Sequence, residues 1–272
     1  MTPLVSLVLG IVEGLTEYLP VSSTGHLILV GRLLGLSDEG SGSFEIVIQL
    51  GAVLAVLVRY GKLLSTRAAG LLEGRPEAYA LWIALIVAFA PTAVAGLLLR
   101  KFIKAHLFGP VPVAFALVVG GLVMIAVERL RAGRSVRADE GLEHVTVRRA
   151  FLIGLGQCLS LWPGSSRSMC TIVAAQLTGL STATAAEFSF LLALPTLGAA
   201  TLYEAYKARR ALVGAVGNAN LAIGLVVSFL VAWAVIGGFV RYLQRRGLEP
   251  FGYYRIALGA VVLGLWLAGR GG

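Results

Sequence analysis

Uninterrupted apolar runs dominate this chain of 272 residues and set its fold class. Each run is 17 to 24 residues long, enough for a helix to cross a hydrocarbon layer of about 30 Å. Only 14% of the residues are charged, against roughly a quarter in soluble domains, which excludes a soluble enzyme and a disordered chain. The runs do not alternate with period two, so a β-barrel is excluded as well. We predict an all-α polytopic membrane protein with six transmembrane helices, at residues 44–60, 78–100, 111–128, 184–204, 218–241 and 251–269.

Two further apolar segments, residues 4–34 and 150–178, are interrupted near their middles. The interruptions are Leu19-Pro20-Val21-Ser22-Ser23-Thr24-Gly25 and Trp162-Pro163-Gly164-Ser165-Ser166-Arg167-Ser168. Proline ends a helix because it lacks an amide proton, and serine caps the start of the next helix. We therefore predict two re-entrant hairpins, each built as helix, break and helix.

The two interruptions indicate an internal repeat, because Pro20 and Pro163 lie 143 residues apart. Each is followed by a span that begins with an acidic residue beside phenylalanine, Glu45 in one and Glu187 in the other. We predict a single integral membrane domain, residues 1–272, made of repeat halves 1–128 and 148–269 joined by a basic loop, 129–147. Three spans in each half reverse the side from which the next half enters, so the repeat is inverted. Folds of this kind place their site near the bilayer midplane, between the broken helices.

Basic residues give the expected orientation of the chain. The net charge is +9, and basic residues beside apolar spans follow the positive-inside rule, so they do not indicate a nucleic-acid partner. Of the 23 Lys and Arg residues, thirteen fall in loops on one side of the membrane and eight on the other. The remaining two, Arg167 and Arg255, lie within apolar segments. The larger group places its side in the cytoplasm, so both termini and the first hairpin are predicted to face the outside.

Three ionisable residues stand in the first hairpin, where a buried charge is costly and marks a functional candidate. Glu13 and Glu17 are four residues apart, on one helical face, and His26 follows the break. Two carboxylates this close either share a proton or bind a divalent cation such as Mg²⁺ or Ca²⁺. A polar seam between helices is the alternative interpretation.

Hydroxyl-rich turns begin the second helix of each hairpin. Such turns can act as helix caps, or they can direct backbone amides and a helix dipole at an anion. Arg167 has no acidic neighbour in the sequence, so we expect an unpaired guanidinium that clamps phosphate. Together the two turns predict a diphosphate pocket that contains the kinds of side chain required for phosphoryl transfer. The predicted phosphate-binding residues are Ser22, Thr24, Gly25, Ser165, Ser166, Ser168 and Thr171.

The second buried arginine and the glycine pairs are assigned structural roles. We expect Arg255 to form an ion pair with Glu45, Glu187 or Glu204, with phosphate contact as the alternative. We expect the pairs Gly120-Gly121 and Gly237-Gly238 to mediate close helix contacts. Exposed pairs of this kind make a homodimer a candidate assembly.

Both interruptions belong to longer motifs. These are Glu13-Gly14-Leu15-Thr16-Glu17-Tyr18-Leu19-Pro20-Val21-Ser22-Ser23-Thr24-Gly25-His26 and Pro163-Gly164-Ser165-Ser166-Arg167-Ser168. They resemble the signature motifs of the undecaprenyl-diphosphate phosphatase family, also called bacitracin-resistance proteins. The resemblance covers most of the chain, including residues 44–51, 115–121 and 187–193. It departs from the family pattern at Met169, where glycine is usual, but Arg167 and Thr171 are in place.

The resemblance implies hydrolysis of undecaprenyl diphosphate to undecaprenyl phosphate and inorganic phosphate, which recycles a carrier lipid for cell-wall synthesis. It also implies bacitracin resistance, a divalent cation and a multi-pass location in the bacterial plasma membrane. The partners would be the polyprenyl diphosphate substrate and membrane lipids.

Matched to this chain, the resemblance assigns the acidic motif and the phosphate contact. Glu13 and Glu17 correspond to the acidic motif, and Arg167 corresponds to the phosphate contact. Ser23 and His26 are the candidate nucleophile and acid or base, and attack by Ser23, by His26 or by water stays open. A transporter or flippase of polyprenyl phosphate is the alternative from another class, because inverted repeats with broken helices are common in secondary transporters.

Overall fold

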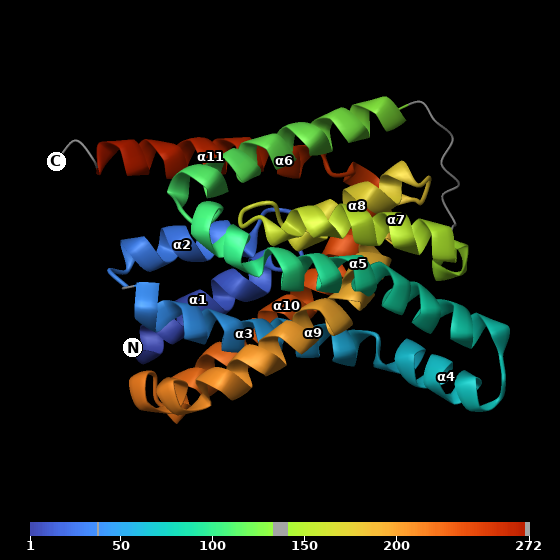
Figure 1. Ribbon diagram of the computed structural model, residues 1–272, viewed down its shortest axis with the longest axis horizontal. Helices are drawn as coiled ribbons and strands as arrows, with labels where there is room; N and C mark the ends of the chain where they lie inside the picture. Colours follow the sequence, from blue (N-terminus) through green and yellow to red (C-terminus); the bar gives the residue numbers. More distant parts are fainter. Residues whose placement is uncertain (37, 133–140, 270–272) are drawn as a thin grey trace.

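The computed structural model describes residues 1–36, 38–132 and 141–269, and this part of the chain is helical without a strand. Residues 133–140 of the predicted basic loop lie outside it. Figure 1 shows the helices side by side, with the start of α1 and the end of α11 at the same end of the bundle. The helices are α1 (Pro3–Thr16), α2 (Ser23–Leu33), α3 (Asp38–Arg59), α4 (Gly61–Leu72), α5 (Pro76–His106), α6 (Pro110–Arg131), η1 (Leu142–His144), α7 (Val147–Gln157), η2 (Cys158–Leu161), α8 (Arg167–Leu177), α9 (Thr182–Ala215), α10 (Asn218–Arg246) and α11 (Glu249–Ala268).

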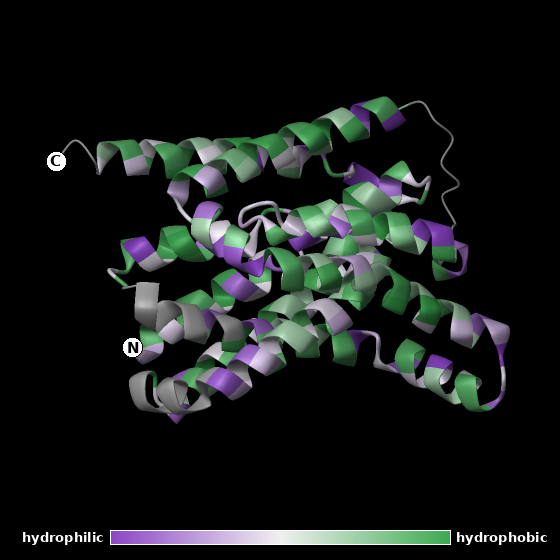
Figure 2. Ribbon diagram, in the orientation of Figure 1, coloured by the Kyte–Doolittle hydropathy of each residue, from purple (hydrophilic) through white to green (hydrophobic). Residues whose placement is uncertain are grey.

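Five of the predicted spans are confirmed as helices long and apolar enough to cross a membrane. Hydrophobic residues cover most of α5 and α6, and hydrophilic residues gather at helix ends (Figure 2). The remaining predicted span, residues 44–60, coincides with α3 up to Arg59, and α4 follows after a bend of 66°. Counted as one bent span, Val47–Arg59 with Gly61–Leu72 brings the total to six. The confirmed spans are Pro76–His106, Pro110–Arg131, Thr182–Glu204, Asn218–Arg246 and Glu249–Ala268.

Both predicted breaks are confirmed, and they share a backbone conformation. Ser22 precedes α2 with a φ of 72°, and Ser166 precedes α8 with a φ of 68°. These are the two positive-φ residues other than glycine in the described chain. Residues with a Cβ rarely adopt this region, so each break reverses the chain through a strained serine. The serine hydroxyl then caps the half-helix that follows.

Glycines allow the helices to approach closely. A Cβ on Gly14 of α1 would lie 2.7 Å from the Ser228 carbonyl oxygen of α10, and a Cβ on Gly121 of α6 would lie 2.6 Å from the Gly252 carbonyl oxygen of α11. The predicted contact role is therefore confirmed for Gly120 and Gly121. It is wrong for Gly238, around which a Cβ would meet nothing within 4 Å.

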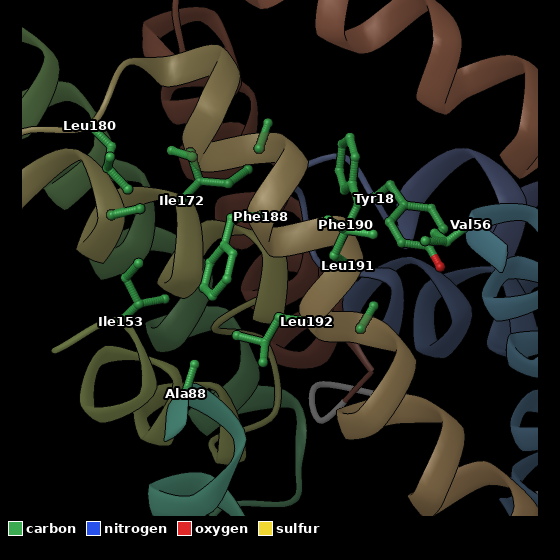
Figure 3. Close-up of a cluster of buried hydrophobic side chains, with 14 of the residues drawn as sticks. Tyr18, Val56, Ala88, Ile153, Ile172, Leu180, Phe188, Phe190, Leu191 and Leu192 are labelled. Atoms are coloured by element: carbon green, nitrogen blue, oxygen red, sulfur yellow. The ribbon is translucent and has the colours of Figure 1, made fainter. Parts of the chain in front are cut away.

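The hydrophobic core surrounds the middle of α9. Phe188, Phe190, Leu191 and Leu192 are fully buried there, and Figure 3 shows the Phe190 ring beside that of Tyr18. These two rings pack edge to face, with centroids 5.3 Å apart. Tyr18 follows the end of α1, so this packing joins the first break to α9.

Candidate active site

One carboxylate, that of Glu17, joins the two broken segments. Its Oε2 accepts a hydrogen bond of 2.7 Å from the hydroxyl of Ser23, the first residue of α2. Its Oε1 lies 3.0 Å from Nη2 of Arg167, the first residue of α8. Gln49 of α3 contacts Oε2 at 3.5 Å. The starts of both half-helices therefore meet at the C-terminal end of α1, as the sequence predicts for residues from the two breaks.

The Arg167 guanidinium has partners at both terminal nitrogens and none at Nε in the described structure, so the prediction that it is unpaired is wrong. Its side chain and that of Glu17 are 7% and 4% exposed, so the ion pair is buried. Nη1 donates to the carbonyl and hydroxyl oxygens of Ser189 at 2.9 and 3.2 Å. The guanidinium carbon also lies 5.5 Å from the centre of the Tyr18 ring. A charge this deeply buried requires such partners. Sequence analysis does not find them, because Glu17 lies 150 residues away from Arg167 in the chain.

Glu13 lies next to this cluster with unused hydrogen-bonding capacity. It is 1% exposed, and its Oε1 has no hydrogen-bond partner. Glu17, Glu45 and Arg167 are charged neighbours of the Glu13 carboxylate. In the part of the chain that the structure describes, no group of three or more His, Cys, Asp or Glu side chains is arranged to hold a metal ion. The acidic pair alone therefore does not form a closed cation site.

His26 has different partners from Ser23. Its Nδ1 lies 2.8 Å from the carbonyl oxygen of Ser22, within the same turn. Its Nε2 lies 2.6 Å from the hydroxyl of Tyr254 in α11. The two rings are nearly parallel, 7° apart, with centroids at 5.6 Å. The imidazole is thus held by the first break and by the last helix.

The predicted phosphate-binding hydroxyls mainly stabilise the two turns. The hydroxyl of Ser22 accepts from the amide of Gly25, and that of Ser166 accepts from Met169, both at 3.3 Å. The cap interpretation is therefore confirmed for these two serines. Ser165 is buried and Thr24 half-buried in the same turns.

Two further hydroxyls tie the second broken segment to its neighbours. Ser168 lies 3.0 Å from Ser166 and donates to the Leu19 carbonyl oxygen at 2.9 Å, so it links the two breaks. Thr171 donates to the Arg167 carbonyl oxygen at 2.9 Å and lies 2.6 Å from the Ser189 hydroxyl. These groups order the site around Arg167.

Arg255 holds three backbone carbonyls, and the expected ion pair with a glutamate is wrong. Its side chain is completely buried. The guanidinium donates to the carbonyl oxygens of Pro20 at 3.1 Å, Ala116 at 3.1 Å and Gly164 at 2.9 Å. Carbonyls at a helix break lack the amide that would follow in a helix, and the planar guanidinium supplies several donors at once. One side chain of α11 thus fixes both breaks.

Sequence reasoning missed three residues of this site. Ser189 lies in an apolar span, two residues after Glu187, and it binds Arg167. Gln49 is the one amide side chain within the first predicted span, which is the signal that could have found it. Tyr254 directly precedes Arg255, but its pairing with His26 bridges 228 residues and has no local signal.

The fold and the site define a class: a multi-pass membrane protein in which a serine, a carboxylate and an arginine meet between two broken helices. Within that class, the chain belongs to the family of the bacitracin resistance protein BacA, whose model matches residues 6–261.

Three relatives show how far the similarity extends. The chain is 59% identical to an undecaprenyl-diphosphatase of Sorangium cellulosum over 263 residues, which cover 96% of this chain and 85% of that protein. It is 49% identical to undecaprenyl-diphosphatase 2 of Rhodospirillum rubrum, over 94% of this chain and 92% of the relative. It is 45% identical to an undecaprenyl-diphosphatase of Novosphingobium aromaticivorans, over 99% of each.

Proposed function

We propose that this chain hydrolyses undecaprenyl diphosphate to undecaprenyl phosphate and inorganic phosphate, and so recycles a carrier lipid for cell-wall synthesis and confers bacitracin resistance. The observation that carries the proposal is the contact of Ser23 and Arg167 with the two oxygens of one buried carboxylate, Glu17. A hydroxyl, its base and an anion-binding group are the parts that phosphoryl transfer requires. The names of the relatives support this function over the transporter alternative.

Ser23 is the nucleophile of the proposed reaction. Its oxygen attacks the terminal phosphorus, its proton passes to Glu17, and the bond from that phosphorus to the bridging oxygen breaks as undecaprenyl phosphate leaves. Water then hydrolyses the phosphoserine and releases phosphate. Arg167 lies beside the attacking hydroxyl through their shared carboxylate and stabilises the charge on the phosphate oxygens. The 2.7 Å bond from Ser23 to Glu17 supports this assignment of the base.

The two alternative nucleophiles have weaker geometric support. His26 already has a partner at each ring nitrogen, Ser22 at Nδ1 and Tyr254 at Nε2. Direct attack by water would leave the Ser23–Glu17 contact without a role in the chemistry. Trapping of a phosphorylated residue during turnover decides among the three nucleophiles. A trapped phosphohistidine would show that His26, and not Ser23, is the nucleophile.

A divalent cation, Mg²⁺ or Ca²⁺, fits the acidic pair only with help from the substrate. Both oxygens of Glu17 have partners, whereas Oε1 of buried Glu13 has none. Magnesium in phosphoryl-transfer sites is held by one or two carboxylates together with substrate phosphates. When bound, the cation would neutralise charge on the diphosphate. We therefore expect Glu13 and Glu17 to hold it in the presence of the diphosphate.

We further propose an inverted repeat of residues 1–128 and 148–269, with six spans and two re-entrant hairpins. The helix contacts are the same when equivalent helices of the two halves are exchanged, which supports the repeat. The contact of α1 with α10 corresponds to that of α7 with α5, while α3 packs on its own equivalent α9 and α6 on its own equivalent α11. In Figure 1, α1 and α2 lie toward the end where α1 begins and α11 ends, and α7 lies toward the other end. The plasma membrane as location, an outward-facing site and a homodimer complete this proposal.

Phosphate release by purified protein in detergent, without a gradient, tests the function. Undecaprenyl diphosphate is supplied with Mg²⁺, with Ca²⁺ or with a chelator. We expect cation-dependent release that Glu17→Gln and Arg167→Lys abolish, while Arg148→Ala, at an exposed arginine, retains it. A folded wild type that releases no phosphate with any cation would refute the phosphatase and make lipid translocation in vesicles the next assay.

A further inference from the structure

The hydrogen bonds of His26 define which nitrogen carries its proton. The carbonyl oxygen of Ser22 can only accept, so the nitrogen 2.8 Å away, Nδ1, is the donor. In the neutral ring Nε2 is then the unprotonated acceptor. Its partner at 2.6 Å is the hydroxyl of Tyr254, which therefore donates to it. Within the resting site, the basic nitrogen of His26 is directed at α11 and not at Ser23.

The position of Tyr254 is itself fixed by its neighbour in the chain. Arg255 is completely buried and donates to the carbonyl oxygens of Pro20 and Gly164, one in each break. These bonds set the register of α11 against the turn that precedes α2. Tyr254 is 47% exposed, so its contact with His26 lies at the edge of the site. The Tyr254 hydroxyl and Nε2 of His26 therefore lie where a lipid headgroup can reach them.

We propose that Tyr254 is a positioning residue of the phosphatase site, an inference that rests on the proposed function: its hydroxyl holds the basic Nε2 of His26 in a fixed place, turned away from Ser23. The serine proton then goes to Glu17, and the imidazole of His26 contacts the diphosphate headgroup or the hydrolytic water.

Turnover of matched tyrosine variants is the first test. Tyr254→Phe removes the hydroxyl and keeps the ring that stacks on His26. We expect kcat to fall roughly 2- to 13-fold, the range of one lost hydrogen bond, with a smaller change in KM. The control is Tyr253→Phe on the next residue, whose hydroxyl bonds Glu249 and Arg129 instead. It should keep wild-type turnover.

A double-mutant cycle shows whether Tyr254 acts through His26. In a His26→Ala background, Tyr254→Phe should have no further effect on turnover, because the partner is already absent. Independent, multiplying losses would show that the hydroxyl acts elsewhere and would overturn the proposal.

Nitrogen NMR of the histidine side chains gives a readout that needs no activity. The chain contains three histidines, and His26→Gln assigns the signals of His26. We expect an Nδ1-protonated ring in the wild type, with a shift of the Nε2 resonance in Tyr254→Phe and none in Tyr253→Phe. An unchanged Nε2 signal in Tyr254→Phe would refute the contact. If the wild type released no phosphate but the signal shifted, the proposed function alone would fail.

Discussion

At the scale of single residues, the buried pair of Glu17 and Arg167 calls for an explanation by chemistry. Removing two charges from water costs several kcal/mol for each ion, so a buried ion pair is a weak source of stability compared with apolar packing. The pair nevertheless occupies the junction of both breaks, with side chains 4% and 7% exposed. The proposed roles of Glu17 as the base for Ser23 and of Arg167 as a phosphate contact would explain why charges stand there.

Loss of Arg167 alone should destabilise the fold more than loss of both charges. Arg167→Ala leaves the Glu17 carboxylate buried without its counterion, which costs about 3–5 kcal/mol. Arg167→Ala combined with Glu17→Gln should recover part of this loss, because no uncompensated charge remains. Unfolding in detergent measures both variants. A double variant no more stable than the single one would contradict the reasoning.

Ser23→Ala should reduce turnover on the order of a thousandfold or more, because it removes the proposed nucleophile. Phosphate release at saturating cation and substrate measures this. Ser65→Ala is the matched control, since Ser65 is exposed on α4 and its hydroxyl bonds only the Lys62 carbonyl oxygen in the described structure. Near-wild-type turnover of Ser23→Ala would eliminate the serine route.

At the scale of elements, sequence predicts the breaks but not what closes them. Proline followed by serine is a local signal, and it correctly predicted that α2 and α8 begin after turns. The contacts that hold the turns are distant: Arg255 and Pro20 are separated by 235 residues, and Arg167 and Glu17 by 150. A buried arginine can satisfy its donors with a glutamate or with carbonyls, and only packing decides between them.

Gly121→Ala should separate α6 from α11 and disturb the site at a distance. Its Cβ would lie 2.6 Å from the Gly252 carbonyl oxygen and 2.9 Å from Cγ1 of Ile256, contacts that only a helix shift relieves. Overpacking of this kind costs about 1–3 kcal/mol, and a shift of α11 moves Arg255. We expect lower stability and lower turnover together.

Gly264→Ala, also on α11, is the control for this packing argument. A Cβ there meets nothing within 4 Å, so turnover should stay at the wild-type value and stability should not fall, because alanine has the higher helix propensity. Thermal unfolding and phosphate release on both glycine variants test the pair. An equal loss of stability in both variants would contradict the packing argument, because the loss would then not depend on the contact between α6 and α11.

At the scale of the whole molecule, the positions of the termini decide the number of crossings. With both hairpins re-entrant, six crossings return the chain to its starting side, whereas five place the termini on opposite sides. The five apolar helices become six when α3 and α4 count as one bent span. Figure 1 shows the start of α1 and the end of α11 at one end of the bundle, which agrees with six. The inverted repeat requires the same number.

Thiol labelling in intact cells tests both the crossing number and the orientation. With Cys158 and Cys170 replaced, a membrane-impermeant thiol reagent should label Thr2→Cys and Ala268→Cys, because eight basic residues on their side against thirteen on the other place the termini outside. Glu73→Cys, at the exposed turn between α4 and α5, should react only after lysis. Labelling of Glu73→Cys alone would keep six crossings and invert the molecule, so that the first hairpin opens to the cytoplasm. Labelling of one terminus without the other would require five crossings, and the inverted repeat would then be wrong.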